Sequence, residues 1–259
     1  MSTSRIGGGS PKIAMRLRLD VEMTRRGLAN SREVAQRLIM AGRVRVNSRP
    51  AAKPDLKVAE EANIDVVGSG PEYASRGGLK LAAALSHFAI DVTAKHALDV
   101  GASTGGFTDV LLRSGAAHVV ALDVGYGQLA DSLRRDSRVT VIDRTNIRYV
   151  EPDALPYRPE LVTIDVSFIS LKLVLPAVIR LAALPATIIA LVKPQFEVGK
   201  GMVGKGGIVR DPNARSGAVQ NVLDFAATLQ LTSAGLIESP VKGAAGNQEY
   251  LTMLSWKGT

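Results

Sequence analysis

Four polar side chains, each next to a predicted strand or turn, are the residues of this sequence best suited to chemistry. They are two lysines and two carboxylates: Lys80, Asp165, Lys193 and Glu249. A lysine can take a proton from a hydroxyl if its pKa falls from about 10.4 towards roughly 7–8, or can stabilise a developing oxyanion while charged. Burial and a second lysine favour the first role, and nearby carboxylates favour the second. The set predicts a site that activates a hydroxyl nucleophile, and both roles stay open, with Lys193 as the principal group.

The elements that must position these residues alternate between apolar strands and helices beyond residue 77. We expect strands near 97–101, 118–123, 139–142, 161–165, 187–192, 235–239 and 249–256 and helices near 79–88, 105–114, 127–134, 170–181 and 212–229. Such alternation predicts an α/β fold with a doubly wound, mostly parallel sheet. Asp165 and Lys193 end two of these strands, and Glu249 begins the last, so the fold can deliver them to one pocket.

A glycine-rich turn follows the first strand, with the sequence Asp-Val-Gly-Ala-Ser-Thr-Gly-Gly-Phe over residues 99–107. Glycine lets the backbone turn tightly and approach a ligand. The spacing is not the Gly-x-Gly-x-x-Gly of dinucleotide folds, and it suits a compact amino-acid tail better than a diphosphate. Asp123 ends the next strand, where a carboxylate can accept both hydroxyls of a ribose. The alternative is a structural turn capped by Ser103 or Thr104.

The ligand-binding residues expected from this turn and from the following strand ends form one group. They are Asp99, Gly101, Ala102, Ser103, Gly105, Gly106, Phe107, Asp123, Val124, Thr145, Asn146 and Asp165. A second glycine segment, residues 199–207, fits most of a phosphate-binding loop, but position 206 is glycine and the magnesium-binding hydroxyl is missing. We expect it to be a loop over the site that touches RNA through Lys200 and Lys205.

Positive charge is concentrated near the N-terminus. Residues 12–57 contain 12 Lys or Arg and 4 Asp or Glu, so they carry the whole net charge of +8. A basic module joined to a neutral body predicts a polyanion-binding arm on a catalytic domain, the alternative being a merely solvated face. Ser31 is an expected helix N-cap, followed by an apolar stripe that ends at Gly42 and by the turn at residues 47–50.

This segment resembles the S4-like RNA-binding module over residues 16–67, and the resemblance implies phosphate contacts. The expected RNA-binding residues of this segment are Arg16, Arg18, Arg25, Arg26, Arg32, Arg43 and Arg45. Arg76, which precedes the catalytic domain, is also expected to bind RNA. Arginine suits this role because its planar group of donors stays charged. The predicted organisation is a disordered tail at 1–14, an S4-like domain at 15–67, a linker at 68–76 and a catalytic domain at 77–259.

Composition excludes several other classes of site. Cysteine is absent, which excludes disulfides, thiolate zinc sites and cysteine nucleophiles, and only three histidines are present, so we expect no metal site. The first 14 residues have no apolar signal region, which together with the lack of cysteine predicts a cytoplasmic protein. The apolar stretch 173–192 contains Pro176 and Pro185, so a buried helix and strand are expected there instead of a membrane span.

The motifs at residues 75–81, 99–107, 121–129, 165–170, 192–199 and 246–250 resemble, in order, those of the TlyA family. These are ribosomal RNA 2′-O-methyltransferases, once labelled hemolysins, with an S4-like arm and an FtsJ-like catalytic domain. The resemblance runs from Arg16 to Trp256. It implies S-adenosylmethionine as the methyl donor, a ribose 2′-hydroxyl of cytidine in ribosomal RNA as the acceptor, and Lys80, Asp165, Lys193 and Glu249 as the catalytic tetrad.

Four other classes of protein fit this sequence less well. A non-catalytic RNA-binding or ribosome-assembly protein is opposed by the intact tetrad, and a hemolysin by the charge layout and the proline-broken apolar stretch. The glycine spacing opposes a dinucleotide-dependent oxidoreductase. A base methyltransferase would use a cysteine, or an Asn/Asp-Pro-Pro-aromatic strand end, and residues 165–168 are Asp-Val-Ser-Phe.

Overall fold

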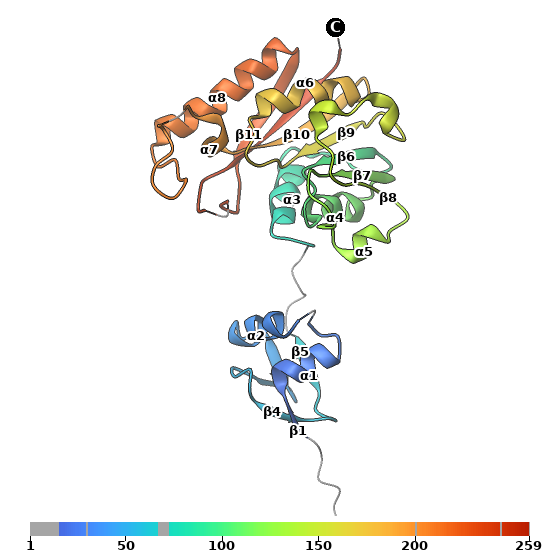
Figure 1. The fold of residues 1–259 in the computed structure, drawn as a ribbon, viewed down its shortest axis with the longest axis vertical. Coiled ribbons are helices and arrows are strands. Elements are labelled where there is room, and N and C mark those ends of the chain that lie inside the picture. The colour runs from blue at the N-terminus through green and yellow to red at the C-terminus, as the bar shows by residue number, and fades with distance from the viewer. Residues whose placement is uncertain (1–15, 30, 67–72, 200, 244, 259) are drawn as a thin grey trace, which may run out of the picture. The chain divides into compact units, whose positions relative to one another are not determined.

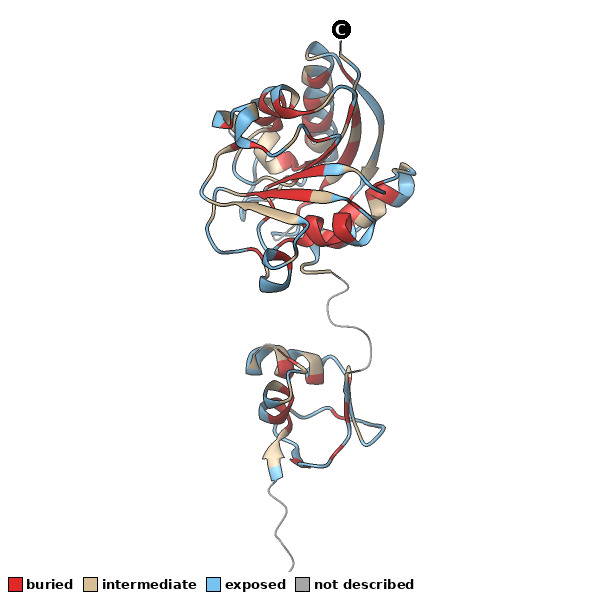
Figure 2. Ribbon diagram, turned by 90° about the vertical axis from the view of Figure 1, so that its right-hand side faces the viewer, coloured by how far each residue is buried: buried red, intermediate tan, exposed pale blue. Residues whose placement is uncertain are grey.

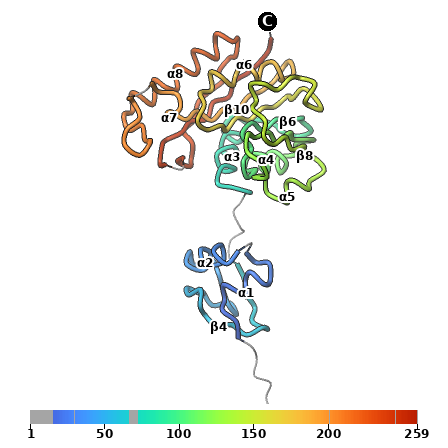
Figure 3. The backbone as a smooth tube through the Cα atoms, viewed as in Figure 1, coloured from blue at the N-terminus to red at the C-terminus, as the bar shows by residue number. Residues whose placement is uncertain are grey.

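The computed structural model describes residues 16–29, 31–66, 73–199, 201–243 and 245–258, which fall into two compact units, Met1–Gly70 and Pro71–Thr259. The backbone trace follows the chain through each unit (Figure 3). The expected tail at 1–14 and residues 68–72 of the expected linker lie outside the described residues. Residues 73–76 belong to the second unit, because the Ala74 amide donates a hydrogen bond to Asp109 over 2.8 Å. The linker prediction therefore extended too far on this side.

The first unit contains two short helices and two small antiparallel sheets. Its elements are β1 (Arg16–Arg18), α1 (Leu19–Arg25), α2 (Arg32–Met40), β2 (Val44–Val46), β3 (Arg49–Pro50), β4 (Lys57–Ala59) and β5 (Ile64–Val66). Strand β1 pairs with β4, and β2 lies between β3 and β5. The Ser31 side chain accepts a hydrogen bond from the Val34 amide, which confirms the predicted cap of α2. Leu19, Met23 and Ile39 are fully buried in its core.

The second unit is built on a seven-stranded sheet. Its strands are β6 (His96–Val100), β7 (His118–Leu122), β8 (Val139–Ile142), β9 (Leu161–Ile164), β10 (Ala186–Val192), β11 (Leu231–Glu238) and β12 (Tyr250–Trp256). Their order is β11-β12-β10-β9-β6-β7-β8, and the last strand, β12, runs antiparallel to both of its neighbours. The other neighbouring pairs are parallel. The chain reverses its winding direction between β6 and β9, and such a switch point is where open α/β sheets bind ligands.

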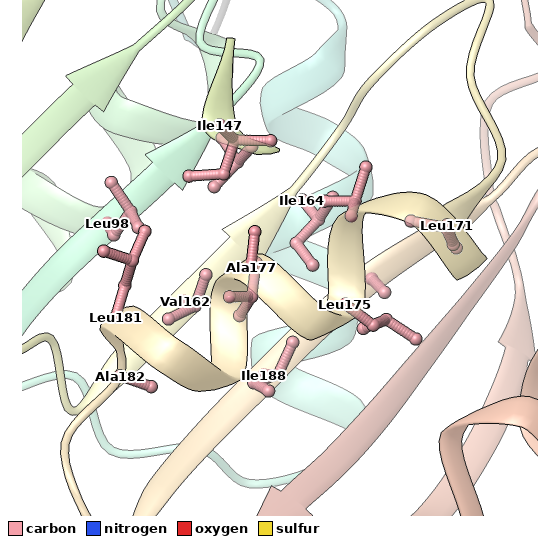
Figure 4. Close-up of a cluster of buried hydrophobic side chains, with 14 of the residues drawn as sticks. Leu98, Ile147, Val162, Ile164, Leu171, Leu175, Ala177, Leu181, Ala182 and Ile188 are labelled. Atoms are coloured by element: carbon pink, nitrogen blue, oxygen red, sulfur yellow. The ribbon is translucent and has the colours of Figure 1, made fainter. Parts of the chain in front are cut away.

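Helices cover both faces of this sheet (Figure 1). Their bounds are α3 (Gly77–His87), α4 (Gly106–Arg113), α5 (Asp131–Arg134), α6 (Leu171–Leu181), α7 (Pro194–Glu197) and α8 (Pro212–Thr228), with 3-10 turns at Ile147–Tyr149 and Pro152–Ala154. Helices α6 and α8 pack on one face, where Val162, Leu175 and Ile188 belong to one apolar cluster (Figure 4). Helices α3, α4 and α5 pack on the other. The central strands β6, β7, β9 and β10 are mostly buried (Figure 2), because helices cover both faces of the sheet there.

Two elements begin four residues away from their predicted starts. Helix α5 starts at Asp131 and not near residue 127, because Gly127 has a φ of 66°, which a right-handed helix cannot contain. Strand β11 starts at Leu231 and not near residue 235, because β12 pairs with it as far as Trp256, across an irregularity between Ser233 and Gly235. Among the residues that the structure describes, no helix is long and apolar enough to span a membrane.

Candidate active site

The strand ends of the sheet bring three of the predicted catalytic residues to one edge. Val100 of β6 pairs with Ile164 of β9, so the glycine turn and Asp165 leave the sheet side by side. Strand β10 ends at Val192 next to β9, and Lys193 follows directly. Val192 also pairs with Tyr250 of the antiparallel β12. Because β12 runs in the opposite direction, its first residues, and Glu249 before them, lie at this same edge.

The two lysines and two carboxylates form two ion pairs. Lys193 Nζ lies 2.6 Å from Asp165 Oδ1 and also donates a hydrogen bond to Ser167 Oγ over 3.0 Å. Lys80, in the first turn of α3, has its Nζ 2.6 Å from Glu249 Oε2. Lys80 and Lys193 are each 8% exposed and Glu249 is 2% exposed. Each lysine is therefore held by a carboxylate in a largely dry environment, where ion pairing fixes its position.

A cleft of about 460 Å³ connects these pairs. Its walls include Lys80, Asp165, Ser167 and Lys193, together with the glycine turn. Glu249 does not line the cleft, because it lies behind Lys80. The structure thus brings three of the predicted catalytic side chains to one cavity and places the fourth against one of them. The arrangement can hold a hydroxyl group next to an amine and stabilise charge that develops on its oxygen.

A second cavity of about 730 Å³ adjoins the cleft and shares Gly101, Ser103, Asp165 and Ser167 with it. Four of the predicted ligand-binding residues line this cavity beyond the shared ones, namely Asp123, Val124, Thr145 and Asn146. Ala102, Gly106 and Phe107 line the first cleft instead. A ligand that extends across both cavities would place one end at the strand ends β7 and β8 and the other at the two lysines.

The backbone at Gly101 requires glycine for two reasons. Its φ is 85°, a conformation that residues with a side chain rarely adopt. An added Cβ would overlap the carbonyl oxygen of Asp165 and lie 2.9 Å from its carbonyl carbon. The glycine turn therefore passes directly against the residue that pairs with Lys193, and the two segments that form the site are in contact.

Asp123 occupies the position expected of a ribose-binding carboxylate. Its Oδ2 accepts a hydrogen bond from the Ser103 amide over 2.8 Å, and its Oδ1 accepts one from the Gly125 amide over 2.7 Å. A carboxylate has about four acceptor sites, so each oxygen keeps capacity for a hydroxyl donor. The side chain is only partly buried and faces the larger cavity.

Two residues predicted to bind the ligand have supporting positions instead. Asp99 is fully buried and lines neither cavity; it accepts hydrogen bonds from Thr108 Oγ1 over 2.7 Å and Thr163 Oγ1 over 3.0 Å. Burial raises the pKa of Asp99 to about 7. Gly105 caps α4 with a φ of 94° and also lies outside both linings. Both residues shape the turn from behind, which corrects the prediction of direct ligand contact.

The segment after Lys193 is fixed to the segment after Asp165. Glu197 of α7 accepts hydrogen bonds from Ser170 Oγ over 2.6 Å and from the Leu171 amide over 2.8 Å, at the start of α6. Burial raises the pKa of Glu197. The Phe168 and Phe196 rings pack with their centroids 5.1 Å apart. These contacts fix the position of Lys193 relative to Asp165, in addition to the pairing of their strands in the sheet.

The predicted RNA-binding arginines divide into two groups. Arg18 and Arg32 pair with Asp20 at 3.0 Å each, and Arg25 pairs with Glu22 at 2.8 Å. Arg26 also pairs with Glu22. Both acids are buried, and hydrogen bonds from Arg18 and Arg25 lower the pKa values of Asp20 and Glu22, respectively. These four guanidinium groups therefore help to hold the first unit together, a role that sequence reasoning missed.

The remaining basic positions are placed as follows. Arg16 and Arg45 are exposed on the first unit, and Arg43 is partly buried there. Arg76 lines the cleft, Lys205 is exposed, and Lys200 lies outside the described residues. Sequence reasoning did not select Ser167 or Lys242, which also line the cleft. The place of Ser167 two residues after Asp165 was a signal for it, whereas Lys242 looks like an ordinary loop lysine.

Known proteins share both units of this chain. The family model for FtsJ-like methyltransferases matches residues 73–256, and the S4 domain model matches residues 17–64. The "16S/23S rRNA (cytidine-2'-O)-methyltransferase TlyA" of Mycobacterium tuberculosis is 53% identical over 93% of this chain and 91% of its own length. "Hemolysin A" of Brachyspira hyodysenteriae is 40% identical over 91% of this chain and 98% of its own length.

Solved structures agree with these matches. One described as "Putative hemolysin from Streptococcus thermophilus" has a TM-score of 0.73 and 41% identity, covering 94% of this chain and 90% of its own. The chain belongs to the FtsJ-like methyltransferase family and, within it, to the TlyA family. This membership confirms the resemblance and the fold class inferred from the sequence.

Proposed function

We propose that this protein transfers a methyl group from S-adenosylmethionine to a ribose 2′-hydroxyl, expected to be that of a cytidine, in ribosomal RNA. The observation that carries the proposal is the cleft in which the Lys193–Asp165 and Lys80–Glu249 pairs meet, next to a cavity with Asp123 at the end of β7. The M. tuberculosis relative is named for methylating cytidine in 16S and 23S ribosomal RNA, which supports ribosomal RNA and cytidine as the acceptor.

The residues around the two cavities fit S-adenosylmethionine. Asp123 retains acceptor capacity for the two ribose hydroxyls. Thr145 and Asn146 line the same cavity and would border the adenine. Gly101 and Ser103 line both cavities, so the amino-acid tail would pass close to the backbone of the glycine turn. When bound, this group supplies a methyl on a positively charged sulfur, which already makes the methyl reactive. The protein must then orient the hydroxyl and remove its proton.

We propose Lys193 as the residue that activates the hydroxyl. Its amine would accept the proton of the hydroxyl group, and Asp165, 2.6 Å from Nζ, would stabilise the ammonium group that results. Ser167 limits the rotation of the Lys193 side chain through its hydrogen bond. Lys80, held by Glu249, positions the ribose and adds positive potential near the oxygen.

The first unit is proposed to capture ribosomal RNA through its exposed basic residues, of which Arg16 and Arg45 are examples. Such contacts go to phosphates, so they add affinity without reading bases. Arg76 and Lys205 would make separate phosphate contacts on the second unit. A cytoplasmic location follows from the proposed substrate.

The test is transfer of a tritiated methyl group from S-adenosylmethionine to ribosomal subunits whose RNA lacks the modification. Lys193→Ala should lower the rate at least a hundredfold, the lower end of what a positioned acid or base contributes, with cofactor affinity by calorimetry nearly unchanged. Lys257→Ala is the matched control, because Lys257 is exposed and follows β12 at the opposite end of that strand. Equal loss of rate and cofactor affinity in Lys193→Ala would contradict the role given to Lys193.

A further inference from the structure

The connection between β11 and β12 forms part of the cleft wall. Val241, Lys242 and Gly243 of this segment, residues 239–249, line the same cleft as Lys80 and Lys193. Gly243 packs against the carboxylate of Glu249, since an added Cβ would overlap Glu249 Oε1. The segment therefore covers the buried Lys80–Glu249 pair and brings a further lysine to the reacting groups.

Asn247 holds this segment in place. The side chain is 2% exposed, its Oδ1 accepts the Val209 amide over 2.9 Å, and its Nδ2 donates to the Gly207 carbonyl over 2.8 Å. Its backbone carbonyl accepts the Gly243 amide over 2.9 Å. One buried amide thus ties the segment 239–249 to residues 207–209. The position of Lys242, next to Gly243, depends on these bonds.

The charges of the cleft are not balanced. Arg76, Lys80, Lys193 and Lys242 line it, and Asp165 is the one acid among the lining residues that the structure describes. Lys80 and Lys193 are neutralised by Glu249 and Asp165. Arg76 and Lys242 are exposed, and within the described part of the chain no carboxylate lies within ion-pairing distance of either. The rim of the cleft therefore attracts an anion that the inner lysines do not bind.

The chemistry of the proposed substrate supplies such an anion. In an RNA strand the 2′-hydroxyl is on the carbon next to the one that carries the 3′-phosphate. A hydroxyl placed at Lys193 brings this phosphate to the same cleft. Its negative charge opposes the negative charge that develops on the hydroxyl oxygen, and a cation beside the phosphate offsets that opposition.

We propose that Lys242 binds the phosphate on the 3′ side of the methylated ribose, with Asn247 as a positioning residue that sets its place. This inference rests on the function proposed above. Arg76 borders the cleft from the start of α3, so it can bind the strand from another wall. Lysine suits a phosphate that varies in orientation, because its ammonium group acts as a point charge.

The test compares Lys242→Gln and Lys242→Arg with the control Lys257→Gln, which removes the same charge away from the site. The probe is a preparation of ribosomal subunits with unmethylated RNA. In Lys242→Gln we expect the KM for subunits to rise roughly 10- to 100-fold, as for loss of one charged hydrogen bond. The slope of binding affinity against salt concentration should fall by the amount expected for about one phosphate contact. Lys242→Arg should restore most of the affinity, and cofactor affinity should not change.

Two results would overturn the inference. In the first, Lys242→Gln behaves like Lys257→Gln. In the second, it loses cofactor affinity, which would assign Lys242 to the carboxylate of the methyl donor. A wild-type protein that transfers no methyl group would overturn both the proposed function and this inference, whereas an active wild type with an unaffected Lys242→Gln would overturn the inference alone.

Asn247 is tested by combining substitutions. Asn247→Ala should raise the KM for subunits, and Lys242→Gln should then add less than twofold, because the lysine is already misplaced. A merely structural role for Asn247 would leave the two effects independent, and their factors would multiply. Multiplying factors would therefore contradict the positioning role.

Discussion

The Lys80–Glu249 pair allows stability and activity to be separated. Glu249 is 2% exposed and Lys80 is 8% exposed, and their charged atoms are 2.6 Å apart. Glu249→Gln keeps the shape of the side chain but removes its charge. It leaves the Lys80 ammonium in a largely dry site without its partner. The double substitution Lys80→Met with Glu249→Leu removes both charges and fills the space with apolar groups.

The expected magnitudes follow from burial. Removing one partner of a buried ion pair destabilises a protein by about 3–5 kcal/mol, since the other charge is left uncompensated. Lys80 borders the cleft and is partly reached by water, so we expect a loss of about 3 kcal/mol. For a domain of this size that corresponds to a fall in Tm of roughly 6–12 °C. The double variant should return to within about 1 kcal/mol of the wild type, because an apolar replacement avoids the desolvation of both ions.

The assay is urea unfolding followed by circular dichroism, together with methyl transfer to ribosomal subunits. A matched control is Asp131→Asn, because Asp131 and Arg135 form an exposed pair 3.7 Å apart with side chains 84% and 81% exposed. Its free energy of unfolding should change by less than about 0.5 kcal/mol. Both Glu249→Gln and the double variant should lose methyl transfer, although the double variant recovers stability.

The reasoning would be refuted by a Glu249→Gln variant as stable as the exposed control. That result would mean that the pair is solvated or that Lys80 readily gives up its charge. A double variant that regains methyl transfer along with stability would refute the catalytic role of the pair and leave it a structural one.

Two further predictions concern the glycine turn. Gly101→Ala should reduce cofactor affinity at least tenfold in calorimetry, because the new Cβ would press on the Asp165 carbonyl and the φ of 85° is unfavourable for alanine; Gly217→Ala, at an open helical position, should leave the affinity unchanged, and equal affinities in both variants would contradict the argument. Burial raises the pKa of Asp99 to about 7 from 3.8, so the folded protein holds a proton that the unfolded chain releases, and the free energy of unfolding should fall as pH rises from about 4 to 7. Asp99→Asn should flatten that part of the profile in urea titrations, and an unchanged slope would show that another group causes it.

Local patterns were enough to predict most elements and the types of the site residues. The cap at Ser31, the apolar runs ending at Ile164 and Val192, and the glycines of residues 101–106 follow from side-chain size, periodicity and backbone freedom, which depend on near neighbours in the chain. The start of α5 was misplaced because glycine can adopt several backbone conformations. The positive φ of Gly127 goes with a hydrogen bond from its amide to Asp143, 16 residues further along the chain.

What the sequence alone determined is therefore which residues carry charge and where strands end. Only the tertiary structure decided their partners. Lys80 contacts Glu249, 169 residues further along the chain, because β12 enters the sheet antiparallel between β10 and β11. Strand order of this kind cannot be inferred from local periodicity. The burial of Asp99, the pairing of Arg18 and Arg32 with Asp20, and the place of Lys242 in the cleft were decided in the same way. The physical reason is that burial and ion pairing depend on distances between segments far apart in the chain, which exist only once the sheet has formed.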